Sequence, residues 1–582
     1  MFGYGKILEI DLSKKKIKKS EIKKNYAKKW LGGNGFGAIE LYKRIKKVDA
    51  FSPNNPLIFA SAALSGLVPI ASCTGVFSRS PLTGFLGESY FRGDFAPEMK
   101  FAGWDVIIIT GKLSKPGYIY IENDNVEIRK CDFWGRDSWE CEDALKKELG
   151  DVEVACIGQA GENLVRFSCI THEYGRQAGR TGLGAVMGSK KLKALAISGS
   201  KGLRPAKPIE LLKLNGEIIK LSLGESTEKY RIYGTSGGVL KLNKAGALPT
   251  KNWNKSTFEF AEKISGQELK QDWKTEEGCF YCPIACGKLT SFGKIKEEGP
   301  EYETIYALGS NCYVKDLKTI AEANELCDRF GIDTITTGNI IALAFELSEK
   351  KLIKEKLKWG SGDDIIKLIK LIVKKKGLGK YMAEGIVPFA KKYKGLKYAV
   401  QVKGLEPGGF HASGLPAYAL SIAVDVRGAD HQRAGAYSID LASEETRYQI
   451  KEKGKLVKKA EDYYTLFDSL GFCKFIRHFM TVELMAKCFT LVTGIETNEK
   501  NLMKAGERIY NVEKLINIKL GWKEKHDNLP WKILNQPLPD GPAKGKKINK
   551  GDFEKMKKEY YKARGWDEKG IPKKSTLKRL GL

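Results

Sequence analysis

Three cysteines stand close together near the middle of the chain, in the stretch CFYCPIACGK from Cys279 to Lys288. Two residues separate Cys279 from Cys282, and three separate Cys282 from Cys286. Cysteines in such a run bind metals, either as a structural zinc site or as an iron–sulfur cluster, and both sites usually take four protein ligands. The sequence therefore predicts a metal centre whose fourth ligand lies elsewhere in the chain.

The spacing of the cysteines separates the kinds of metal site. Structural zinc usually shows a second C-x-x-C pair, which this sequence lacks, and a radical-SAM site has its spacings of three and two in the opposite order. A cubane four-iron cluster with a distant fourth ligand is the interpretation that the spacing favours. The chain has 12 cysteines and no signal-peptide run at its N-terminus, which argues against a disulfide framework and for a cytoplasmic metalloprotein.

Length and charge limit the class of protein. A chain of 582 residues exceeds what one hydrophobic core supports, so two to four domains are expected. The formal net charge of +29 is compatible with nucleic acid, with a Lys-rich thermophile surface or with an acidic protein partner. The lysines are spread along the chain, which favours the second interpretation and leaves the third open. The uncharged stretch from Pro56 to Phe77 contains two prolines, so we expect a strand, a turn and a second strand there, not a membrane helix.

Hydrophobic periodicity divides the chain into three regions of an α+β fold. Alternating apolar residues predict a β-rich domain over residues 1–207, and apolar spacings of three and four predict mainly α-helical domains over 208–395 and 396–582. No low-complexity linker separates the regions, so we expect them to pack tightly. The expected strands are KILEIDL, PLIFASA, DVIIITGK, GYIYIEN, NVEIRK, VEVACIG and ALAISGS, and the expected helices include IELLKLNGEIIKLSL, LKTIAEANELCDRFG, NIIALAFELSEKKLIKE, TVELMAKCFTLVTG and NEKNLMKAGERIYNVEKLINIKLG.

A repeated six-residue pattern offers a fourth ligand. DRFGID (Asp328 to Asp333) and DSLGFC (Asp468 to Cys473) both read Asp, two residues, Gly, one residue, then Asp or Cys. The Gly allows a turn after a helix, and the last residue can then project toward a ligand. Either copy alone is most simply a helix C-cap, but the pair beside a three-cysteine run favours two related sites. The Gly-rich string GGNGFGA lacks a preceding strand, so a dinucleotide-binding interpretation is set aside.

These motifs carry a resemblance that extends from end to end of the chain. The sequence resembles the aldehyde ferredoxin oxidoreductase family of tungsten–pterin enzymes. Each motif alone is weak, but ten of them in family order are specific. They are SRSPLTG, IGQAGENLVRFSCI, GRQAGRTGLGAVMGSKKLKA, CFYCPIACGK, GPEYET, DRFGID, VKGLEPGG, RGADHQRA, DSLGFC and the closing ARGWDEKGIPKKSTLKRLGL.

The resemblance implies a set of cofactors. One tungsten would be held by the dithiolene sulfurs of two pterins, as tungsten-bis(molybdopterin), beside one 4Fe-4S cluster, with the β-rich domain as the base for the pterins. A magnesium ion that bridges the pterin phosphates belongs to the same expectation. The cofactor would supply the tungsten ligands, so the chain needs few histidines of its own, and it has only five. The sequence does not choose between tungsten and molybdenum.

The resemblance also assigns residues to these cofactors. Cys473 becomes the fourth cluster ligand beside Cys279, Cys282 and Cys286. A carboxylate accepts hydrogen bonds from the amino edge of a pterin, so Asp333 and Asp468 are expected to hold one pterin each. The arginines have surface salt bridges as their alternative role. The further expected cofactor contacts are Arg79, Arg176, Gln177, Gly179, Arg180, Gly471 and Phe472.

Two motifs supply the expected catalytic groups. Oxidation of an aldehyde to an acid needs a base for water and a group that stabilises the developing oxyanion or carries a proton. By resemblance these are Glu301 or Glu303 in GPEYET, with Glu303 slightly favoured, and His431 in RGADHQRA. The alternative for His431 is an interior structural histidine.

Three functions follow as hypotheses, with different partners. The first is oxidation of a small aldehyde with ferredoxin as the electron acceptor. The second is a low-potential reaction of the same fold, such as reduction of a carboxylic acid or an aromatic thioester. The third, which the sequence disfavours, is a basic iron–sulfur protein that binds nucleic acid. We expect no membrane and no nucleic-acid partner, and a homodimer is compatible with the family.

Three departures from the family pattern limit what carries over. Cys327 stands before Asp328, and no histidine lies between Thr334 and Phe410, so a metal site that bridges two subunits is not expected. The segment GESYFRGDF replaces a family pterin-contacting segment after SPLTG, so those contacts are not expected from it. His411 is open between a role in the substrate pocket and a role in capping a turn.

Overall fold

The computed structural model describes residues 1–582 and has a β-rich N-terminal region. The first of its two six-stranded sheets has the strand order β2-β1-β6-β3-β4-β5, in which β1 and β6 run parallel and the other neighbours antiparallel. All seven predicted strands are present across the two sheets. The strands of the first sheet are β1 (Lys6–Asp11), β2 (Lys16–Glu21), β3 (Leu57–Ala60), β4 (Thr74–Arg79), β5 (Leu86–Phe91) and β6 (Trp104–Thr110).

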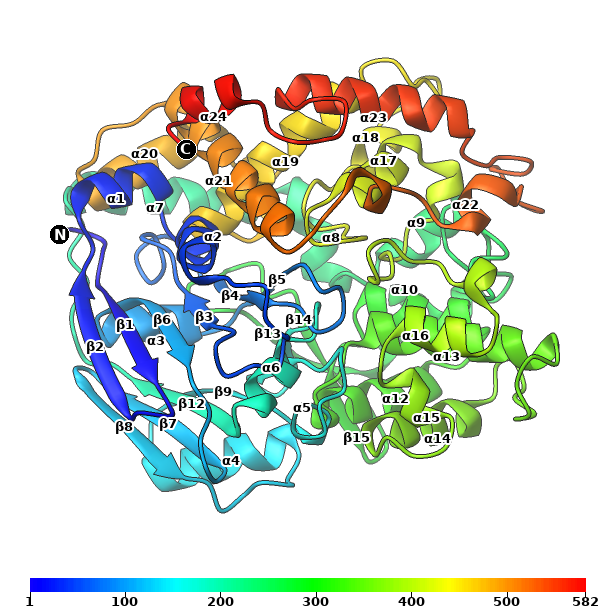
Figure 1. Cartoon of the computed structure of the whole chain (residues 1–582), viewed down its shortest axis with the longest axis horizontal. Helices are drawn as coiled ribbons and strands as arrows, with labels where there is room; N and C mark the ends of the chain where they lie inside the picture. Colours follow the sequence, from blue (N-terminus) through cyan, green and yellow to red (C-terminus); the bar gives the residue numbers. More distant parts are fainter.

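The second sheet faces the first across a shared core. Its order is β11-β10-β9-β12-β7-β8, and one cluster of 26 buried residues joins Ile107 and Phe59 of the first sheet to Ile119 and Leu195 of the second. Figure 1 shows these strands gathered at the lower left, away from the C-terminal helices. The strands of the second sheet are β7 (Gly117–Glu122), β8 (Asn125–Lys130), β9 (Glu153–Cys156), β10 (Ile170–His172), β11 (Arg176–Ala178) and β12 (Leu192–Ser198).

The predicted pair of strands in the uncharged stretch is confirmed. β3 and β4 pair antiparallel, with Phe59 opposite Val76, and their residues are almost all buried. The stretch contains no helix, and none of the helices of the chain combines the length and apolarity that are needed to cross a membrane. Burial inside the β-rich region therefore explains why the stretch carries no charge.

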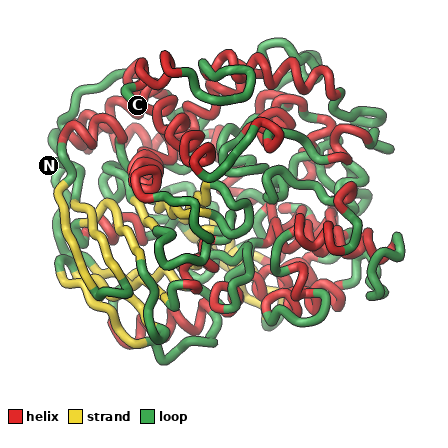
Figure 2. Tube along the Cα trace, in the orientation of Figure 1, coloured by secondary structure: helices red, strands yellow, loops and turns green.

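Helices make up most of the rest of the chain (Figure 2), and the five predicted helices are present. In Figure 1 most of the middle region lies at the right, although its first helix α7 lies at the upper left, and the last third lies along the top. The helices are α1 (Lys24–Trp30), α2 (Gly33–Arg44), α3 (Phe95–Phe101), α4 (Ser138–Leu149), α5 (Gln159–Glu162), α6 (Leu183–Ser189), α7 (Pro208–Ser222), α8 (Glu225–Tyr233), α9 (Gly238–Lys244), α10 (Gly266–Leu269), α11 (Tyr302–Thr304), α12 (Leu317–Phe330), α13 (Thr334–Glu349), α14 (Gly362–Val373), α15 (Gly379–Met382), α16 (Ile386–Lys392), α17 (Pro416–Val424), α18 (Tyr437–Asp440), α19 (Lys453–Leu470), α20 (Val482–Thr493), α21 (Glu499–Lys519), α22 (Trp531–Asn535), α23 (Lys550–Arg564) and α24 (Lys574–Leu580).

A small third sheet interrupts the helical middle region. It contains β13 (Trp273–Glu277), β14 (Gly287–Phe292) and β15 (Ile295–Glu298), paired antiparallel in that order. Glu277 lies opposite Gly287, so the run of three cysteines forms the loop of the first hairpin. Periodicity over a few polar residues does not predict such short strands.

The three predicted regions share a core. One cluster of 117 buried residues includes Ile58 from the first region, Leu343 from the second and Phe467 from the third. Tight packing between the regions, expected from the lack of linkers, is confirmed. The divisions near residues 207 and 395 stay predictions, because a shared core gives no boundary of its own.

Candidate active site

The four predicted cluster ligands come together. Cys279, Cys282 and Cys286 on the hairpin loop and Cys473 from beyond α19 line one cavity of about 190 Å³. Burial raises the pKa of the Cys279 thiol, and it raises that of Cys282 to about 12. Buried thiolates need a compensating positive charge, which metal coordination supplies. The donor set therefore fits a four-iron cluster, and the ligand roles themselves stay predictions.

A loop of the β-rich region holds the two parts of this centre together. Ile70 donates its amide to the carbonyl of Tyr281 (3.1 Å), inside the cysteine loop. The carbonyl of the same Ile70 accepts the amide of Cys473 (3.0 Å). One residue thus links ligands that are far apart in sequence.

The second copy of the repeated motif places Cys473. α19 ends at Gly471, whose φ of 84° is a left-handed conformation that favours glycine, and Phe472 then forms a bridge with Ala71. Gly471 and Phe472 do not line the cavities of the site, although cofactor contacts were predicted for both. Their backbone instead turns the chain so that Cys473 faces the other three cysteines.

The first copy has the same backbone plan. α12 ends at Gly331, with a φ of 68°, and Ile332 forms a bridge with Ser168 of the β-rich region. Asp333 then donates its amide to the carbonyl of Phe167 (3.1 Å) and caps α13, because its Oδ1 accepts the amide of Ile335 (2.9 Å). The two copies therefore dock on the β-rich region in the same manner.

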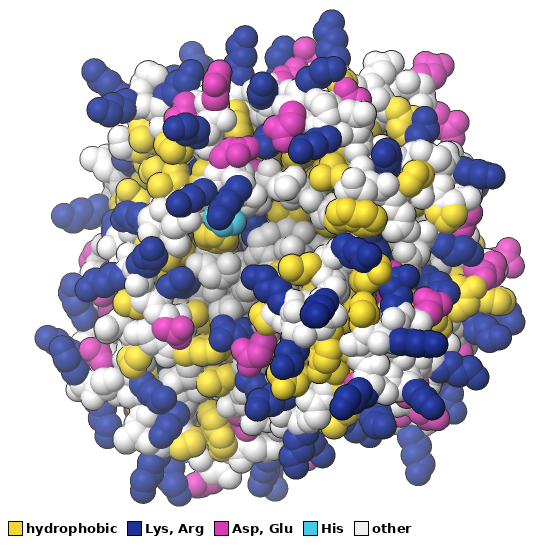
Figure 3. All heavy atoms as spheres, turned by 45° about the vertical axis from the view of Figure 1, so that its right-hand side comes forward, with side chains coloured by type: hydrophobic (Ala, Val, Ile, Leu, Met, Phe, Trp, Pro, Cys, Tyr) yellow, Lys and Arg dark blue, Asp and Glu magenta, His cyan; other side chains and the backbone are white.

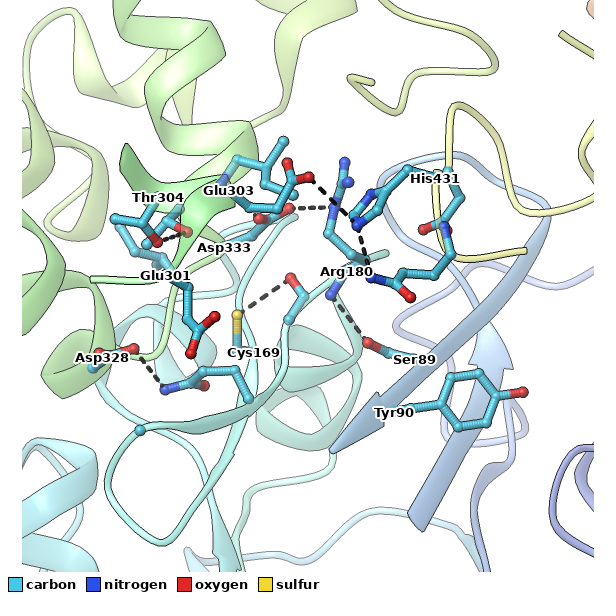
Figure 4. Close-up of a pocket in the computed structure, with 18 of the residues that line it drawn as sticks. Ser89, Tyr90, Cys169, Arg180, Glu301, Glu303, Thr304, Asp328, Asp333 and His431 are labelled. Atoms are coloured by element: carbon cyan, nitrogen blue, oxygen red, sulfur yellow. Dashed lines mark hydrogen bonds and ion pairs between the residues drawn. The ribbon is translucent and has the colours of Figure 1, made fainter. Parts of the chain in front are cut away.

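A polar cavity of about 300 Å³ adjoins the cysteine cavity (Figure 4). Arg180 lies in it with Nε 2.8 Å from Asp333 Oδ2, and Nη2 donates to the carbonyl of Glu406 (2.8 Å). The Nη1 atom of Arg180 is buried and has no protein partner. Gln177 donates to Asp328 (3.1 Å) on another wall of the cavity. An unpartnered buried guanidinium nitrogen fits an anionic or carbonyl group of a bound pterin cofactor.

Only some of the other residues predicted to contact the pterins line the 300 Å³ cavity. Gly179 lines the 300 Å³ cavity, whereas Arg176 lines the cysteine cavity and pairs with Glu298 (2.9 Å). Asp468 pairs through Oδ2 with Lys474 (2.8 Å), a residue of the cavity wall, and its buried Oδ1 has no partner. Asp468 itself lines none of the cavities of the site, so its contact with a pterin stays a prediction.

Arg79 is not brought to these cavities. Its Nε donates to the carbonyl of Gly84 (3.0 Å), and its Nη1 donates to the carbonyl of Val48. Backbone carbonyls at a turn thus satisfy the guanidinium away from the 300 Å³ cavity, so the predicted cofactor contact of Arg79 has no support in the structure.

The segment that departs from the family pattern does contribute to the site. Ser89, Tyr90 and Arg92 of GESYFRGDF line the 300 Å³ cavity, and Arg92 also lines the cysteine cavity. Burial acts to lower the pKa of Arg92, but the negative charges of Cys473 and its neighbours outweigh that effect and raise it. No local motif marks Arg92, and the sequence analysis missed it. Other residues missed by the sequence analysis are Glu298, Arg427, Asp430, Gln432 and Lys474.

The predicted catalytic pair is close together. Glu303 Oε1 lies 3.4 Å from His431 Nε2, and Glu303 Oε2 accepts the amide of Gly409 (2.9 Å), as Figure 4 shows for the Glu303–His431 pair. A Cβ on Gly408 would lie 2.5 Å from His431 Nδ1, so the glycine leaves room for the ring. Burial raises the pKa of Glu303, although the neighbouring His431 opposes the shift. A carboxyl with a raised pKa beside an imidazole can exchange a proton at moderate pH.

Geometry distinguishes the two glutamates. Glu301 precedes α11, and its carboxylate accepts the hydroxyl of Thr235, whereas only Glu303 faces His431. Glu301 lines all three cavities, including the cysteine cavity, and burial raises its pKa as well. The arrangement favours Glu303 as the base, as the sequence analysis did.

A third cavity of about 540 Å³ opens on the other side of this pair. Glu301, Glu303 and His431 line both it and the 300 Å³ cavity, so the pair lies at the junction of the two. Aromatic rings form much of the outer wall, including those of Tyr437 and Phe475. A mostly apolar cavity of this size that ends at an acid–base pair is typical of a substrate pocket.

His411 does not line this pocket. It is buried, its Nε2 lies 3.1 Å from the carbonyl of Trp253, and its ring packs against the Trp253 ring. Its side chain makes no capping hydrogen bond to the helical turn that follows. It is therefore a core residue, and neither suggested role is supported.

The surface of the molecule is rich in basic side chains. Figure 3 shows Lys and Arg spread around the face that it draws, with fewer Asp and Glu between them. This matches the dispersed lysines of the sequence.

Comparisons with known proteins agree on the family. The family model "Aldehyde ferredoxin oxidoreductase, N-terminal domain" matches residues 7–199, and the model for domains 2 and 3 matches residues 214–582. The tungsten-containing aldehyde ferredoxin oxidoreductase of Pyrococcus abyssi is 38% identical over 100% of this chain and 99% of its own. An aliphatic sulfonate oxidoreductase, WOR-like subunit, of Pyrococcus furiosus is 32% identical over 100% and 97%.

A solved structure shares the fold. The active-site complex of benzoyl coenzyme A reductase with 1,5-dienoyl-CoA superposes with a TM-score of 0.86 at 25% identity, covering 100% of this chain and 97% of that one. Together with the two matched family models and the full-length relatives, the shared fold identifies the family of the chain. The chain belongs to the aldehyde ferredoxin oxidoreductase family and is an oxidoreductase of that type.

Proposed function

We propose that this chain oxidises an aldehyde to the carboxylic acid and passes the electrons through a 4Fe-4S cluster to ferredoxin. The observation that carries the proposal is the Glu303–His431 pair at the junction of the polar cavity and the apolar pocket. The relatives named as tungsten-containing aldehyde ferredoxin oxidoreductases support the same reaction.

The residues can manage the protons of this reaction. An aldehyde and one water give the acid, two electrons and the released protons. Glu303, ionised above its raised pKa, takes a proton from the water that adds to the carbonyl carbon. His431, 3.4 Å away, can donate a hydrogen bond to the oxygen that gains negative charge, or pass the proton onward. The Gly409 amide holds Glu303 in position.

Cofactors would supply the electron chemistry. Tungsten-bis(molybdopterin) would supply a two-electron acceptor, and a 4Fe-4S cluster would supply one-electron transfer. Arg180, Gln177, Gly179 and Asp333, which line the polar cavity, would hold the pterins. Asp468 is proposed as a further contact, because its buried Oδ1 has no protein partner. Cys279, Cys282, Cys286 and Cys473 would hold the cluster. A magnesium ion between the pterin phosphates is part of the same proposal.

The position of the cluster suits an external electron acceptor. Three of its proposed ligands are partly exposed, and Tyr281 between two of them has 40% of its surface exposed. An acidic ferredoxin could approach this loop on a molecule of formal charge +29 in the cytoplasm.

A second candidate is the reduction of an aromatic acid or thioester. The likeness to the benzoyl coenzyme A reductase complex and the aromatic walls of the 540 Å³ pocket favour it. Both candidates need the same cofactors, so only substrates distinguish them.

Aldehyde-dependent reduction of ferredoxin or of a viologen dye by the loaded enzyme tests the proposal. We expect turnover with an aldehyde and a loss of about 10²- to 10⁴-fold in kcat for Glu303→Gln, with the metal content unchanged. Glu301→Gln is the matched comparison and should lose less. Reduction of benzoyl coenzyme A without aldehyde oxidation would favour the second candidate.

A further inference from the structure

The outer part of the 540 Å³ pocket carries positive charge that no carboxylate balances. Lys229, Lys241 and Arg477 line it, and none of the three forms an ion pair. The only carboxylates on its wall are Glu301 and Glu303, at the end next to the polar cavity. The pocket therefore has a catalytic end and a cationic end.

Arg477 is the cation held most firmly. Its Nη1 donates to the carbonyl of Lys474 (3.0 Å) and to the hydroxyl of Tyr230 (3.3 Å), and the side chain is half-buried. Neither Nε nor Nη2 has a protein partner, so both can bind a ligand. The turn that begins at Cys473 also delivers Arg477, which ties this cation to the site.

The neighbouring groups show that the cations converge. Burial lowers the pKa of His478, and the positive charges of Arg477, Lys229 and Lys241 lower it further. These three side chains come from α8, α9 and the turn after Cys473. Cations that gather without carboxylates repel one another, so the arrangement costs free energy unless an anion binds.

Two pairs of stacked aromatic rings line the wall of the pocket. The rings of Phe410 and Tyr437 are stacked with centroids 3.8 Å apart, and those of Tyr230 and Phe475 are 4.2 Å apart. All four line the pocket. They provide an apolar surface for the carbon skeleton of a substrate.

We propose that the substrate is an aldehyde with a second, anionic group, such as a carboxylate or a sulfonate, which binds at Arg477. This inference rests on the proposed function and specifies its substrate class. The carboxylate that the reaction creates would form beside Glu303, not at the cationic end, so product binding does not explain the cations. Arg477 lines the pocket and is half-buried, so an anionic group of a molecule bound in the pocket can reach it.

Matched pairs of aldehydes test the proposal with the loaded enzyme. The pairs are 4-formylbenzoate with benzaldehyde, 4-formylbenzenesulfonate with benzaldehyde, and 4-oxobutanoate with butanal. We expect kcat/KM to be at least tenfold higher for the anionic member, which corresponds to about 1.4 kcal/mol, with the difference mainly in KM. Added salt should reduce this preference.

Variants locate the preference. Arg477→Gln should lower the ratio of kcat/KM within each pair at least tenfold, and Arg477→Lys should restore part of it. Lys241→Gln should have a smaller effect, because Lys241 is exposed at the rim. Arg579→Gln, a surface change beside Glu507, is the control and should leave the ratio unchanged.

The outcomes separate this inference from the proposed function. Equal kcat/KM within every pair, or a ratio that Arg477→Gln leaves unchanged, overturns the inference while aldehyde oxidation stands. If no aldehyde is oxidised, the proposed function fails. Calorimetric titration of the loaded enzyme with terephthalate then shows whether the pocket binds an anion. Salt-sensitive binding that Arg477→Gln abolishes supports the anion site, and no binding overturns it.

Discussion

The two copies of the repeated motif share a backbone plan and differ in the side chains that it presents. Both end a helix at a glycine of positive φ, Gly331 or Gly471, and both dock the next residue on the β-rich region. The first copy then presents Asp333 to Arg180 across 2.8 Å, and the second presents Cys473 to three other cysteines. One local geometry can thus serve a cofactor contact or a metal ligand, according to its last residue.

The opening aspartates of the two copies differ in their partners. Asp328 accepts hydrogen bonds from the neutral amides of Gln177 and Asn324. Asp468 instead lies 2.8 Å from the ammonium group of Lys474 and 3.6 Å from Arg433. Burial without a neighbouring cation raises the pKa of Asp328 and favours its neutral form. The copies therefore offer different hydrogen-bonding groups to a cofactor.

Substitutions of the last residue of each motif copy, Cys473 and Asp333, should differ most in their effect on the iron content. Cys473→Ser removes a proposed cluster ligand, so we expect the loss of iron and a fall in activity of at least about 10³-fold. Asp333→Asn at the matching position should retain the iron. Iron analysis and the electron paramagnetic resonance spectrum of the reduced protein measure this. A full iron complement in Cys473→Ser would show that Cys473 is not a ligand.

The opening aspartate of the second copy should matter for stability. Asp468→Asn leaves Lys474 buried without its counter-ion, which should cost about 3 to 5 kcal/mol, whereas Arg433 keeps its pairs with Glu88 and Glu513. The midpoint of urea unfolding under anaerobic conditions measures the loss. The double variant Asp468→Asn with Lys474→Met should recover part of it. A variant as stable as the parent would mean that the ion pair contributes nothing.

The glycines should have smaller and similar effects. Gly331→Ala and Gly471→Ala force a side chain into a left-handed conformation, at a cost of about 1 to 2 kcal/mol each. An added Cβ would also be crowded at both positions, 3.0 Å from Ala62 Cβ at Gly471 and 3.1 Å from the Gly158 nitrogen at Gly331, so the two variants should lose similar stability. Gly293→Ala, at a positive-φ glycine with no neighbour within 4 Å of an added Cβ, is the control for the backbone cost alone. If both variants unfold at the same urea concentration as the parent, a side chain at these two positions costs no stability, which would contradict this prediction.

The smallest effect should come from the opening aspartate of the first copy. Burial raises the pKa of the Asp328 carboxyl well above its usual value. The stability that this carboxyl contributes is therefore fully present below its pKa in the unfolded chain. It is lost as the pH rises through the pKa of the folded protein. Asp328→Asn mimics the protonated form and should change stability by less than about 1 kcal/mol at about pH 4 and below, where the parent carboxyl is protonated.

The pH dependence of Asp328→Asn checks the sign of this shift. The variant should gain stability relative to the parent as pH rises from about 5 to about 8, because only the parent pays for ionisation. Urea midpoints at several pH values measure it. A variant that loses stability relative to the parent over that range would show that Asp328 is charged in the folded protein.

Much of the fold was predictable because its strands and helices carry strong periodicity. The seven predicted strands include the buried runs β6 and β12, and long amphipathic segments such as α12 gave the helices. The edge strand β2 was missed because its residues are nearly all exposed and polar, and β13 to β15 were missed because they are largely polar and only partly buried.

The site was predictable only where a motif marked it. The cysteines, Gln177, Arg180, Glu303 and His431 stand in recognisable stretches and come together in the structure. Arg92 and Arg477 stand in no such stretch. Their positions depend on how the β5 region and the turn after Cys473 pack against the cavities, and tertiary packing of that kind leaves no local pattern. Arg79 is the opposite case. It stands in the recognisable stretch SRSPLTG, but its side chain holds a turn and does not reach the cavities.

Elemental and pterin analysis of the anaerobically purified protein tests the central claim most directly, since every proposed role depends on the two cofactor cavities. The account predicts about one tungsten, about four iron and about two pterins per chain. Iron without pterin, or zinc alone, in a preparation supplied with all the cofactors would contradict it.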